Sequence, residues 1–474
     1  MMMDDGQYLG TRTCRCCADD GQAAFHCNLP HFFILADPSN QVSQMGSTRA
    51  ILLVVVVLVL LIVGSTSYEP PKQPAVPTQT SSRRSVLQTA VAAGSAALFG
   101  RPAQSSAKAT LQGYNPELAV TRPEAGRFYF PTLTPPFQNR ATYRYELGRN
   151  AWALEQLLVF ANVTATVRTV VVKMNDGGLW VNGPQWPTGE YCALLEELGP
   201  VKHVVVPCNA FEHKIPTSAF VKKYPKASVW VTPGQYGPFG SCGLDLKSCK
   251  MGYRVDGVLP VGTPKSSDAL PPWANEFDFR SLYVSLPENA GPVSEAAFLH
   301  RPSNTLITTD AVAYIPDEAP PIFGSYFDSD TIQDESFWPK SVLQAVFLPL
   351  RQGDGPSIDE KWPGYGAIRG RLVRAPILRA FSDARAPNAV REWVNNIPSM
   401  GKFDRILTAH FASPISAETA DFLQAFNFLD GPSNDPPISC GDWKTLDDLN
   451  TFIAENNLGA AVAKGFDYKN GCPQ

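Results

Sequence analysis

The sequence predicts a layered α/β fold with its functional site at one edge of the sheets. A strand pair closed by a tight turn is followed by a helix and a third strand, an order typical of helices packed on a sheet. In addition, three predicted strands end next to side chains that can bind metal or move protons. The strand at 201–206 leads to Glu212 and His213, and two later strands lead to Asp310 and to His410. Open α/β sheets place their chemistry at such strand ends.

The first strand pair lies between residues 166 and 181. Residues 166–173 are rich in β-branched side chains, the Asn-Asp-Gly-Gly run at 175–178 supplies the positive φ angles of a tight turn, and 179–181 form the returning strand. A helix follows, because Thr188 is a favourable N-cap and leucines recur after it at helical spacing. Four valines within 201–206 then predict a short buried strand.

The later part of the chain continues the alternation of strands and helices. We predict a helix at 219–224, a strand at 228–232, a hairpin of 295–299 with 305–309, a helix at 386–396, a strand at 405–409 and a helix after Ser416. The stretches 234–272 and 316–363 show no regular period. We expect these two stretches to form the walls of the functional pocket.

The N-terminal residues are predicted to be targeting sequence. Residues 1–44 are a disordered segment or a wrongly extended gene start. Residues 45–64 contain a thirteen-residue apolar run, too short to span a membrane and typical of a secretory signal. The stretch 65–82 is transit-like, and 83–109 begins with two arginines and ends in Ala-Lys-Ala, the layout of a twin-arginine signal. Signals in this order predict the thylakoid lumen of a plastid, such as the complex plastid of an alga.

The remaining chain is predicted to form one domain over 110–430 and a helical tail over 431–474. Of the 474 residues, 44% are hydrophobic and 18% are charged, which is enough to bury a full core. A formal net charge of -4 gives no reason to expect nucleic acid as a partner. We also expect no stable membrane span in the mature chain.

Five segments in a specific order resemble the DUF4336 family: DGGLWVNGP, LGPVKHVVVPCNAFEHK, YPKASVWVTPGQ, EAAFLHRPSNTLITTDAVAYIP and FDRILTAHFASPI. The resemblance covers roughly residues 163–431. That family is itself similar to the metallo-β-lactamase fold. The resemblance therefore implies an αββα sandwich, in which two mostly β sheets pack face to face with helices outside and a metal site at one sheet edge.

The resemblance also implies a reduced set of metal ligands. The superfamily loop reads His-x-His-x-Asp-His, whereas the loop here reads Cys-Asn-Ala-Phe-Glu-His and lacks both leading histidines. Glu212 falls at the acid and His213 at the last histidine. A later histidine is absent around Pro292, while Asp310 and His410 match the pattern. These four matching residues can hold one Zn²⁺ or another divalent transition metal if they converge, and a centre with two ions is not expected.

Each candidate also has a purely structural explanation. Glu212 and His213 can form a polar pair that keeps the loop closed. Asp310 can cap a turn after its strand, and His410 is open to the same kind of explanation. Cys208 is either a soft ligand in place of a histidine or a small buried filler.

Two disulfides are predicted in the mature chain. Cys242 with Cys249 closes the tip of an insertion, and Cys440 with Cys472 clips a tail helix that begins near Thr445. The thylakoid lumen can support such bonds.

Two functions from different classes remain open. In the first, the protein is a binding or assembly factor with little or no catalysis, and its partner is a lumenal protein or a small molecule. In the second, it is a mononuclear metal-dependent hydrolase of a small substrate, in which Glu212 or Asp310 acts as the base and His410 steadies charge. The missing histidines favour the first function.

Overall fold

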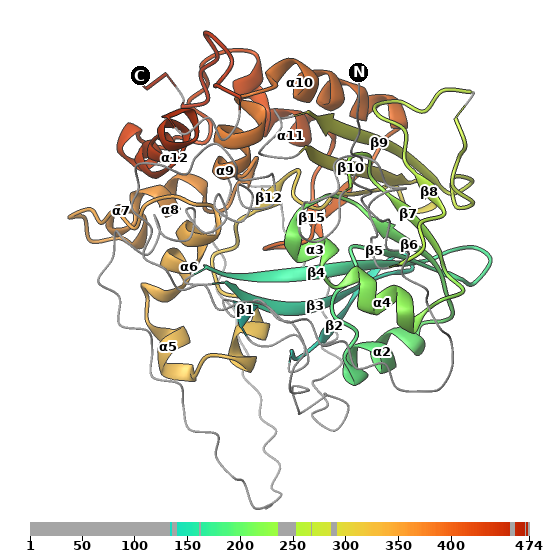
Figure 1. The fold of residues 1–474 in the computed structure, drawn as a ribbon. Helices are drawn as coiled ribbons and strands as arrows, with labels where there is room; N and C mark the ends of the chain where they lie inside the picture. The colour runs from blue at the N-terminus through green and yellow to red at the C-terminus, as the bar shows by residue number, and fades with distance from the viewer. Residues whose placement is uncertain are drawn as a thin grey trace, which may run out of the picture. The chain divides into compact units, whose positions relative to one another are not determined.

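Two β-sheets pack face to face in this computed structural model, with helices on the outer side of each sheet (Figure 1). The structure describes residues 133–134, 140–160, 163–235, 253–266, 268–285, 292–455, 460–469 and 471–472. The predictions for residues 1–109 and the pairing of Cys242 with Cys249 lie outside this part. The four layers are the αββα sandwich, of metallo-β-lactamase type, that the family resemblance implies.

The first sheet is formed mainly by the N-terminal half of the described chain. Its strand order is β1-β3-β4-β5-β6-β7-β8, and β2 pairs with β3. The pairs on the β1 to β5 side are antiparallel, and those from β5 to β8 are parallel. The strands are β1 (Leu133–Thr134), β2 (Tyr143–Gly148), β3 (Ala151–Phe160), β4 (Val163–Lys173), β5 (Leu179–Asn182), β6 (Val201–Val206), β7 (Ser228–Val231) and β8 (Gly257–Val258).

The second sheet has the order β15-β14-β11-β10-β9. Its central pair, β11 and β14, is parallel, with Ile307 opposite Leu407. A separate two-stranded sheet joins β12 to β13. The strands are β9 (Phe277–Val284), β10 (Val293–His300), β11 (Thr305–Ile307), β12 (Ala313–Tyr314), β13 (Leu372–Val373), β14 (Arg405–Leu407) and β15 (Ile415–Ser416).

Large aromatic side chains fill the space between the two sheets. Trp180 of β5 is fully buried and stacks on Phe277 of β9, with ring centroids 4.4 Å apart. Phe298 of β10 meets the same indole edge-on at 5.2 Å. Because each sheet contributes rings to one cluster, this core holds the sheets together.

Helices cover the outer face of each sheet. Tyr191 of α2 and Phe220 of α4 are buried against the first sheet, whereas Trp393 of α10 and Phe422 of α11 are buried against the second. The N-cap prediction is confirmed, since the hydroxyl of Thr188 accepts from the Tyr191 amide at 3.1 Å. These helices are α2 (Gly189–Glu196), α3 (Phe211–Lys214), α4 (Thr217–Lys223), α10 (Pro387–Asn396) and α11 (Thr419–Gln424).

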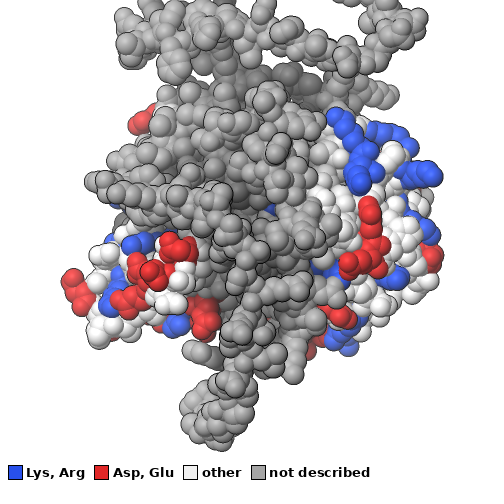
Figure 2. All heavy atoms as spheres, turned by 90° about the horizontal axis from the view of Figure 1, so that it is seen from below, with Lys and Arg blue, Asp and Glu red and all other residues white. Residues whose placement is uncertain are grey.

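The stretch 316–363, which has no readable period, forms short helices that pack on a further core cluster with the tail. The helices of this stretch are α5 (Ser329–Gln333), α6 (Phe337–Ala345) and α7 (Ile358–Lys361). They are followed by α8 (Pro363–Ile368), α9 (Pro376–Leu378) and, in the tail, α12 (Lys444–Glu455). The predicted disulfide between Cys440 and Cys472 is present. No helix in the described ranges is long and apolar enough to cross a membrane. Where Figure 2 shows described residues, both basic and acidic side chains lie at the surface.

Candidate metal centre

Three loops from both sheets meet at one edge of the sandwich. His213 lies in α3, directly after β6 of the first sheet. Asp310 and His410 follow β11 and β14, the parallel neighbours of the second sheet. Pairing continues beyond these strands, since the Thr308 amide donates to the Leu407 carbonyl at 2.9 Å. Parallel strands end at the same edge of a sheet, so the two loops emerge side by side.

The three side chains point ligand atoms at one another. Nε2 of His410 lies 3.1 Å from Oδ1 of Asp310 and 3.2 Å from Nε2 of His213. Nε2 of His213 lies 3.4 Å from the same Asp310 oxygen. Ligand atoms about 2.0–2.1 Å from a tetrahedral zinc ion are about 3.3 Å apart. The triangle therefore has the size of one face of a zinc coordination tetrahedron.

Glu212 is close to this triangle but less buried. One carboxylate oxygen of Glu212 and the ligand atoms of the other three residues all lie within 4.8 Å of one another. Glu212 is half-buried, whereas His213 is fully buried. All four residues selected from the sequence are thus brought together, with His213, Asp310 and His410 forming the tighter group.

One atom of the triangle lacks an ordinary partner. Oδ1 of Asp310 is buried and forms no hydrogen bond, although two imidazole nitrogens are near it. Buried polar atoms are usually hydrogen-bonded, so an orphaned carboxylate oxygen between two imidazoles fits a position prepared for a cation. The residues present therefore fit a bound divalent metal.

The charges at the triangle favour an anionic Asp310. Burial alone raises the pKa of this carboxyl group, but the adjacent His213 and His410 imidazoles outweigh burial and hold the pKa well below its usual value. Burial lowers the pKa of His410, yet the adjacent, negatively charged Asp310 carboxylate produces a net increase. An ionised carboxylate flanked by two imidazoles is a donor set suited to zinc.

Backbone and buried side chains fix the orientation of His410. Its Nδ1 donates to the carbonyl of Thr166 in β4 at 2.6 Å, which leaves Nε2 facing the triangle. Arg168, also in β4, donates to the carbonyls of Thr408 and Phe411 at 2.8 and 2.5 Å. Its guanidinium is paired with the buried Glu155 at 2.6 Å. A buried ion pair of the first sheet therefore anchors a loop of the second.

The Asp310 loop is held from both sides by residues that sequence reasoning missed. Oε1 of Glu295 in β10 accepts the amides of Thr309 and Asp310 at 2.9 and 3.2 Å. From the other side, Arg374 donates to the Asp310 carbonyl at 3.3 Å and forms a two-pronged pair with Asp383, both contacts being 2.8 Å. An acid inside an otherwise apolar strand is the only signal in the sequence that points to Glu295.

Cys208 and Glu295 lie beside the place of the missing histidines. Sγ of Cys208 is 3.6 Å from Oδ2 of Asp310, and a Glu295 oxygen joins this second group of three. Burial, followed by the nearby carboxylates, raises the pKa of the Cys208 thiol well above its usual value. Because a zinc ligand must be a thiolate, this thiol is suited to donate a hydrogen bond to Asp310.

Two other histidines lie outside the centre. Nδ1 of His203 pairs with the Ser228 hydroxyl, and Nδ1 of His300 with the Ser303 hydroxyl, each at 2.7 Å. These contacts give both histidines a structural role.

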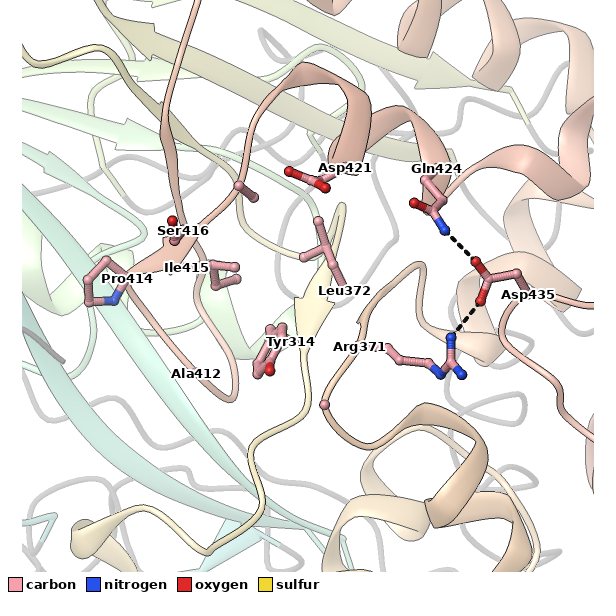
Figure 3. A pocket seen from close by; sticks show the side chains of 12 residues that line it. Tyr314, Arg371, Leu372, Ala412, Pro414, Ile415, Ser416, Asp421, Gln424 and Asp435 are labelled. Carbon is pink, nitrogen blue, oxygen red and sulfur yellow. Dashed lines mark hydrogen bonds and ion pairs between the residues drawn. The ribbon is translucent and has the colours of Figure 1, made fainter. Parts of the chain in front are cut away.

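The prediction that 234–272 and 316–363 form the walls of the functional pocket stays a prediction, because 236–252 lie outside the described residues. The stretch 316–363 packs side chains into a core cluster. A pocket of about 200 Å³ lies next to the His410 loop (Figure 3), and its lining includes none of the four candidate ligands. The pocket is lined by Tyr314, Gly370, Arg371, Leu372, Ala412, Pro414, Ile415, Ser416, Ala417, Asp421, Gln424 and Asp435.

Two packed sheets with outer helices, and a cluster of candidate metal ligands at one edge, define a metallo-β-lactamase-like fold. The sequence matches the family described as "Domain of unknown function (DUF4336)" over residues 149–340 and 359–428, which is more than half of the chain. The chain belongs to this family. No curated protein matches the sequence.

Several solved structures are similar to this chain. A metallo-β-lactamase from Hirschia baltica is 10% identical with a TM-score of 0.33, covering 62% of this chain and 99% of that chain. The metallo-β-lactamase FIM-1 from Pseudomonas aeruginosa, in its mono-zinc form, is 8% identical with a TM-score of 0.30, covering 61% and 94%. The Flv1 flavodiiron core from Synechocystis is 8% identical with a TM-score of 0.34, covering 62% of each chain. These likenesses concern the fold alone.

Proposed function

We propose that the protein binds one divalent transition-metal ion, with zinc as the expected ion, and uses it as a mononuclear hydrolase. The observation that supports this most directly is the triangle of His213, Asp310 and His410, whose edges of 3.1–3.4 Å match a zinc coordination face. Catalytic zinc sites have three protein ligands and keep a fourth position for water or substrate.

The chain's own residues have distinct roles in this proposal. When bound, the ion lowers the pKa of a water molecule and polarises a carbonyl or phosphoryl oxygen of the substrate. Glu212 is the general base, because its carboxylate is near the triangle and only half-buried. Asp310, the other base expected from the sequence, is a ligand instead. The hydrogen bond from His410 to Thr166 keeps the imidazole in its ligand orientation.

One ion, not two, is favoured by what surrounds Asp310. Its second oxygen faces the Cys208 thiol, and the two backbone amides next to it are bound by Glu295. Burial also raises the pKa of Glu295 well above its usual value, with the Asp310 charge adding to the effect. Because their raised pKa values make this thiol and this acid release their protons less readily, they hold a second cation poorly.

The test starts with metal analysis of the purified full-length protein. We expect about one zinc per chain in the wild type and only traces in the His213→Ala/Asp310→Ala double variant, while Cys192→Ala, at a buried cysteine in α2, keeps the wild-type content. Only trace metal in the folded wild type, or equal metal in the double variant, contradicts the proposal.

An open coordination position can be tested without knowing the substrate. After replacement of zinc by Co²⁺, the visible absorption of the wild type should shift when azide is added, because the anion enters the fourth position. In Glu212→Gln, metal affinity should stay within about threefold and the azide shift should persist, while any hydrolysis of a chromogenic ester or phosphodiester probe is lost.

A metal-stabilised binding or assembly factor is the second candidate. It is favoured by the presence of Glu212 within the same 4.8 Å group, because a fourth protein ligand closes the tetrahedron as in structural zinc sites. In this case Glu212→Gln should lower zinc affinity by about 10-fold to 100-fold, and azide should leave the Co²⁺ spectrum of the wild type unchanged.

We also propose the thylakoid lumen of a plastid as the site of action. This proposal is supported by the order of the segments at 45–64, 65–82 and 83–109 in the sequence. Import into isolated plastids checks it. The processed protein should be protected from protease in intact thylakoids, and replacing Arg83 and Arg84 by lysine should abolish that protection.

A further inference from the structure

Residues 460–469 and 471–472, called the strap below, pack against the segment after α9 and against α12. A disulfide joins Cys472 at its end to Cys440, which begins the short turn before α12. Cys440 is exposed and Cys472 is half-buried. The disulfide is therefore open to solvent on the Cys440 side, where a dissolved thiol can reach it.

The strap is bonded to the segment that follows α9. The Ala463 amide donates to the Ala384 carbonyl at 2.8 Å, and Nε of Arg385 donates to the Ala460 carbonyl at 2.8 Å. Farther along, the Tyr468 hydroxyl donates to Asp447 of α12 at 2.5 Å. Both ends of the strap are thus attached, one to residues 384–385 and the other to α12.

Ala384 directly follows a π-helical turn, Arg379–Asp383, whose last residue pairs with Arg374. The Asp383 carboxylate is fully buried and binds Arg374 through two contacts of 2.8 Å. Arg374 in turn donates to the carbonyls of Asp310 and Ala311, at 3.3 and 3.1 Å. π-helical turns are rare and occur often at functional sites.

A short, continuous path therefore joins the strap to a candidate metal ligand. It runs from Ala463 to Ala384, through the adjacent Asp383 to Arg374, and from Arg374 to the backbone of Asp310. Tail helix α12 supports the same turn, since Asn450 donates to the Ala380 carbonyl at 3.2 Å. The disulfide closes the loop that contains both α12 and the strap.

We propose that the Cys440–Cys472 disulfide is a redox switch that sets the metal affinity of the centre through the strap. This inference rests on the proposed metal-binding function. In the oxidised protein, the closed loop holds the π-helical turn, and Arg374 keeps Asp310 in its ligand position. In the reduced protein, the strap is freed from Cys440 and the support of Asp310 is weakened.

The reductant is a dithiol. One of its thiolates attacks the exposed sulfur of Cys440, the disulfide bond breaks, and Cys472 leaves as a thiolate that takes up a proton. The second thiol of the reductant then attacks the mixed disulfide and releases Cys440. Two electrons pass to the protein, two cysteine thiols form, and the dithiol becomes a disulfide.

The experiment compares zinc affinity in the two redox states of the full-length chain. The protein is reduced with a phosphine, the phosphine is removed by gel filtration without oxygen, and the dissociation constant for zinc is measured against a chromophoric chelator. Thiol labelling with mass spectrometry verifies the state of Cys440 and Cys472. We expect zinc to bind about tenfold more weakly after reduction, the size of change usual when support of a metal ligand is lost.

Three variants make the test specific. Cys440→Ser/Cys472→Ser should bind zinc like the reduced wild type and should no longer respond to the phosphine. Asp383→Asn, which interrupts the path without touching the disulfide, should weaken binding in the oxidised state. Cys192→Ser, at a buried free cysteine in α2, should keep the full response of the wild type.

Each result decides between the proposals. Equal zinc affinity in both redox states, with the centre still binding zinc, overturns the switch and leaves the proposed function intact. Absence of zinc binding in both states overturns the proposed function and the switch together. Loss of the far-ultraviolet circular dichroism on reduction also overturns the switch, because the disulfide then supports the whole fold.

Discussion

Oδ1 of Asp310 lies 3.1 Å from Nε2 of His410, although the two residues belong to separate loops. The contact exists because β11 and β14 are parallel neighbours and both loops leave the sheet at the same edge. His213 approaches the same oxygen at 3.4 Å from the other sheet. Much of the behaviour expected of this protein depends on whether an ion is bound among these three residues.

Bound zinc should stabilise the folded protein. An ion that binds only the folded state at 100 times its dissociation constant adds about 2.7 kcal/mol to the free energy of unfolding. Thermal unfolding with zinc and with a chelator measures this difference, and calcium serves as the control ion. The His213→Ala variant should show no zinc-dependent shift. An equal shift in that variant would place the ion elsewhere.

The Arg168–Glu155 pair should contribute to the site as well as to stability. Arg168→Met leaves a buried carboxylate unpaired and should cost about 3–5 kcal/mol in urea unfolding. The double variant Arg168→Met/Glu155→Leu should recover most of this loss. It should still bind zinc more weakly than the wild type, because the bonds to the Thr408 and Phe411 carbonyls are gone. If the double variant bound zinc as tightly as the wild type, the Arg168–Glu155 pair would contribute to stability only and not to the metal site.

Cys208 should be dispensable for binding the ion. The thiol contacts the Asp310 oxygen that faces away from the two imidazoles, and its pKa is raised. We therefore expect Cys208→Val to change zinc affinity by less than about threefold, a small effect beside the 10-fold to 100-fold losses seen when metal ligands lose support. Isothermal titration with zinc checks this, with His410→Ala as the positive control. A large loss in Cys208→Val would identify the sulfur as a ligand.

The stability should fall on acidification because of His300. Burial, with Arg405 and Arg301 nearby, lowers the pKa of this histidine from 6.5 to about 4, and these effects outweigh the Glu276 carboxylate 3.7 Å away. Between these two pH values the unfolded chain binds more protons at this residue than the folded chain does. The free energy of unfolding therefore decreases as the pH falls through this window.

This pH dependence can be measured by urea unfolding between pH 7 and pH 4. In wild type the free energy of unfolding should fall between pH 7 and pH 4. In His300→Gln this fall should be smaller by an amount on the order of 1 kcal/mol. The comparison concerns the slope, since the substitution also changes the stability at neutral pH by removing the bond to Ser303. His203→Gln is the comparison at a half-buried histidine whose pKa burial also lowers, and it should reduce the slope less than His300→Gln does. Identical slopes in wild type and His300→Gln would show that other groups cause the acid sensitivity.

The aromatic core between the sheets should be sensitive to truncation. Trp180 is fully buried and stacks on Phe277, so Trp180→Ala should cost about 3–5 kcal/mol. Val261→Ala, at a side chain that is 55% exposed, should change stability by less than about 0.5 kcal/mol. Chemical denaturation of both variants makes the comparison. Similar small effects would contradict the assigned core.

Local chemistry explains which parts of the fold could be predicted. The hairpin of β4 and β5 was predictable because Gly177, at a φ of 80°, and the β-branched strand act over a few residues. β3 was missed because Ala, Leu, Glu and Gln favour helices in isolation. In the fold, Glu155 faces Arg168 across the β3–β4 pair, and this tertiary contact outweighs local propensity.

The candidate ligands could be predicted because each follows a recognisable strand. Their supports could not, because Glu295, Arg374 and Asp383 are buried by segments far away in the sequence. A charged residue in a sequence is normally expected at the surface. Only the assembled fold shows that these three charges surround the Asp310 loop.

His213 comes from the end of a strand in one sheet, whereas Asp310 and His410 come from the other. An ion held by all three ties together halves of the molecule that are synthesised at different times. A nascent chain in which β14 has not yet been synthesised lacks His410, one of the three metal-binding side chains. Binding of the ion by all three residues therefore requires that both sheets have been synthesised and have packed against each other. Metal content would thus report that folding of the sandwich is complete.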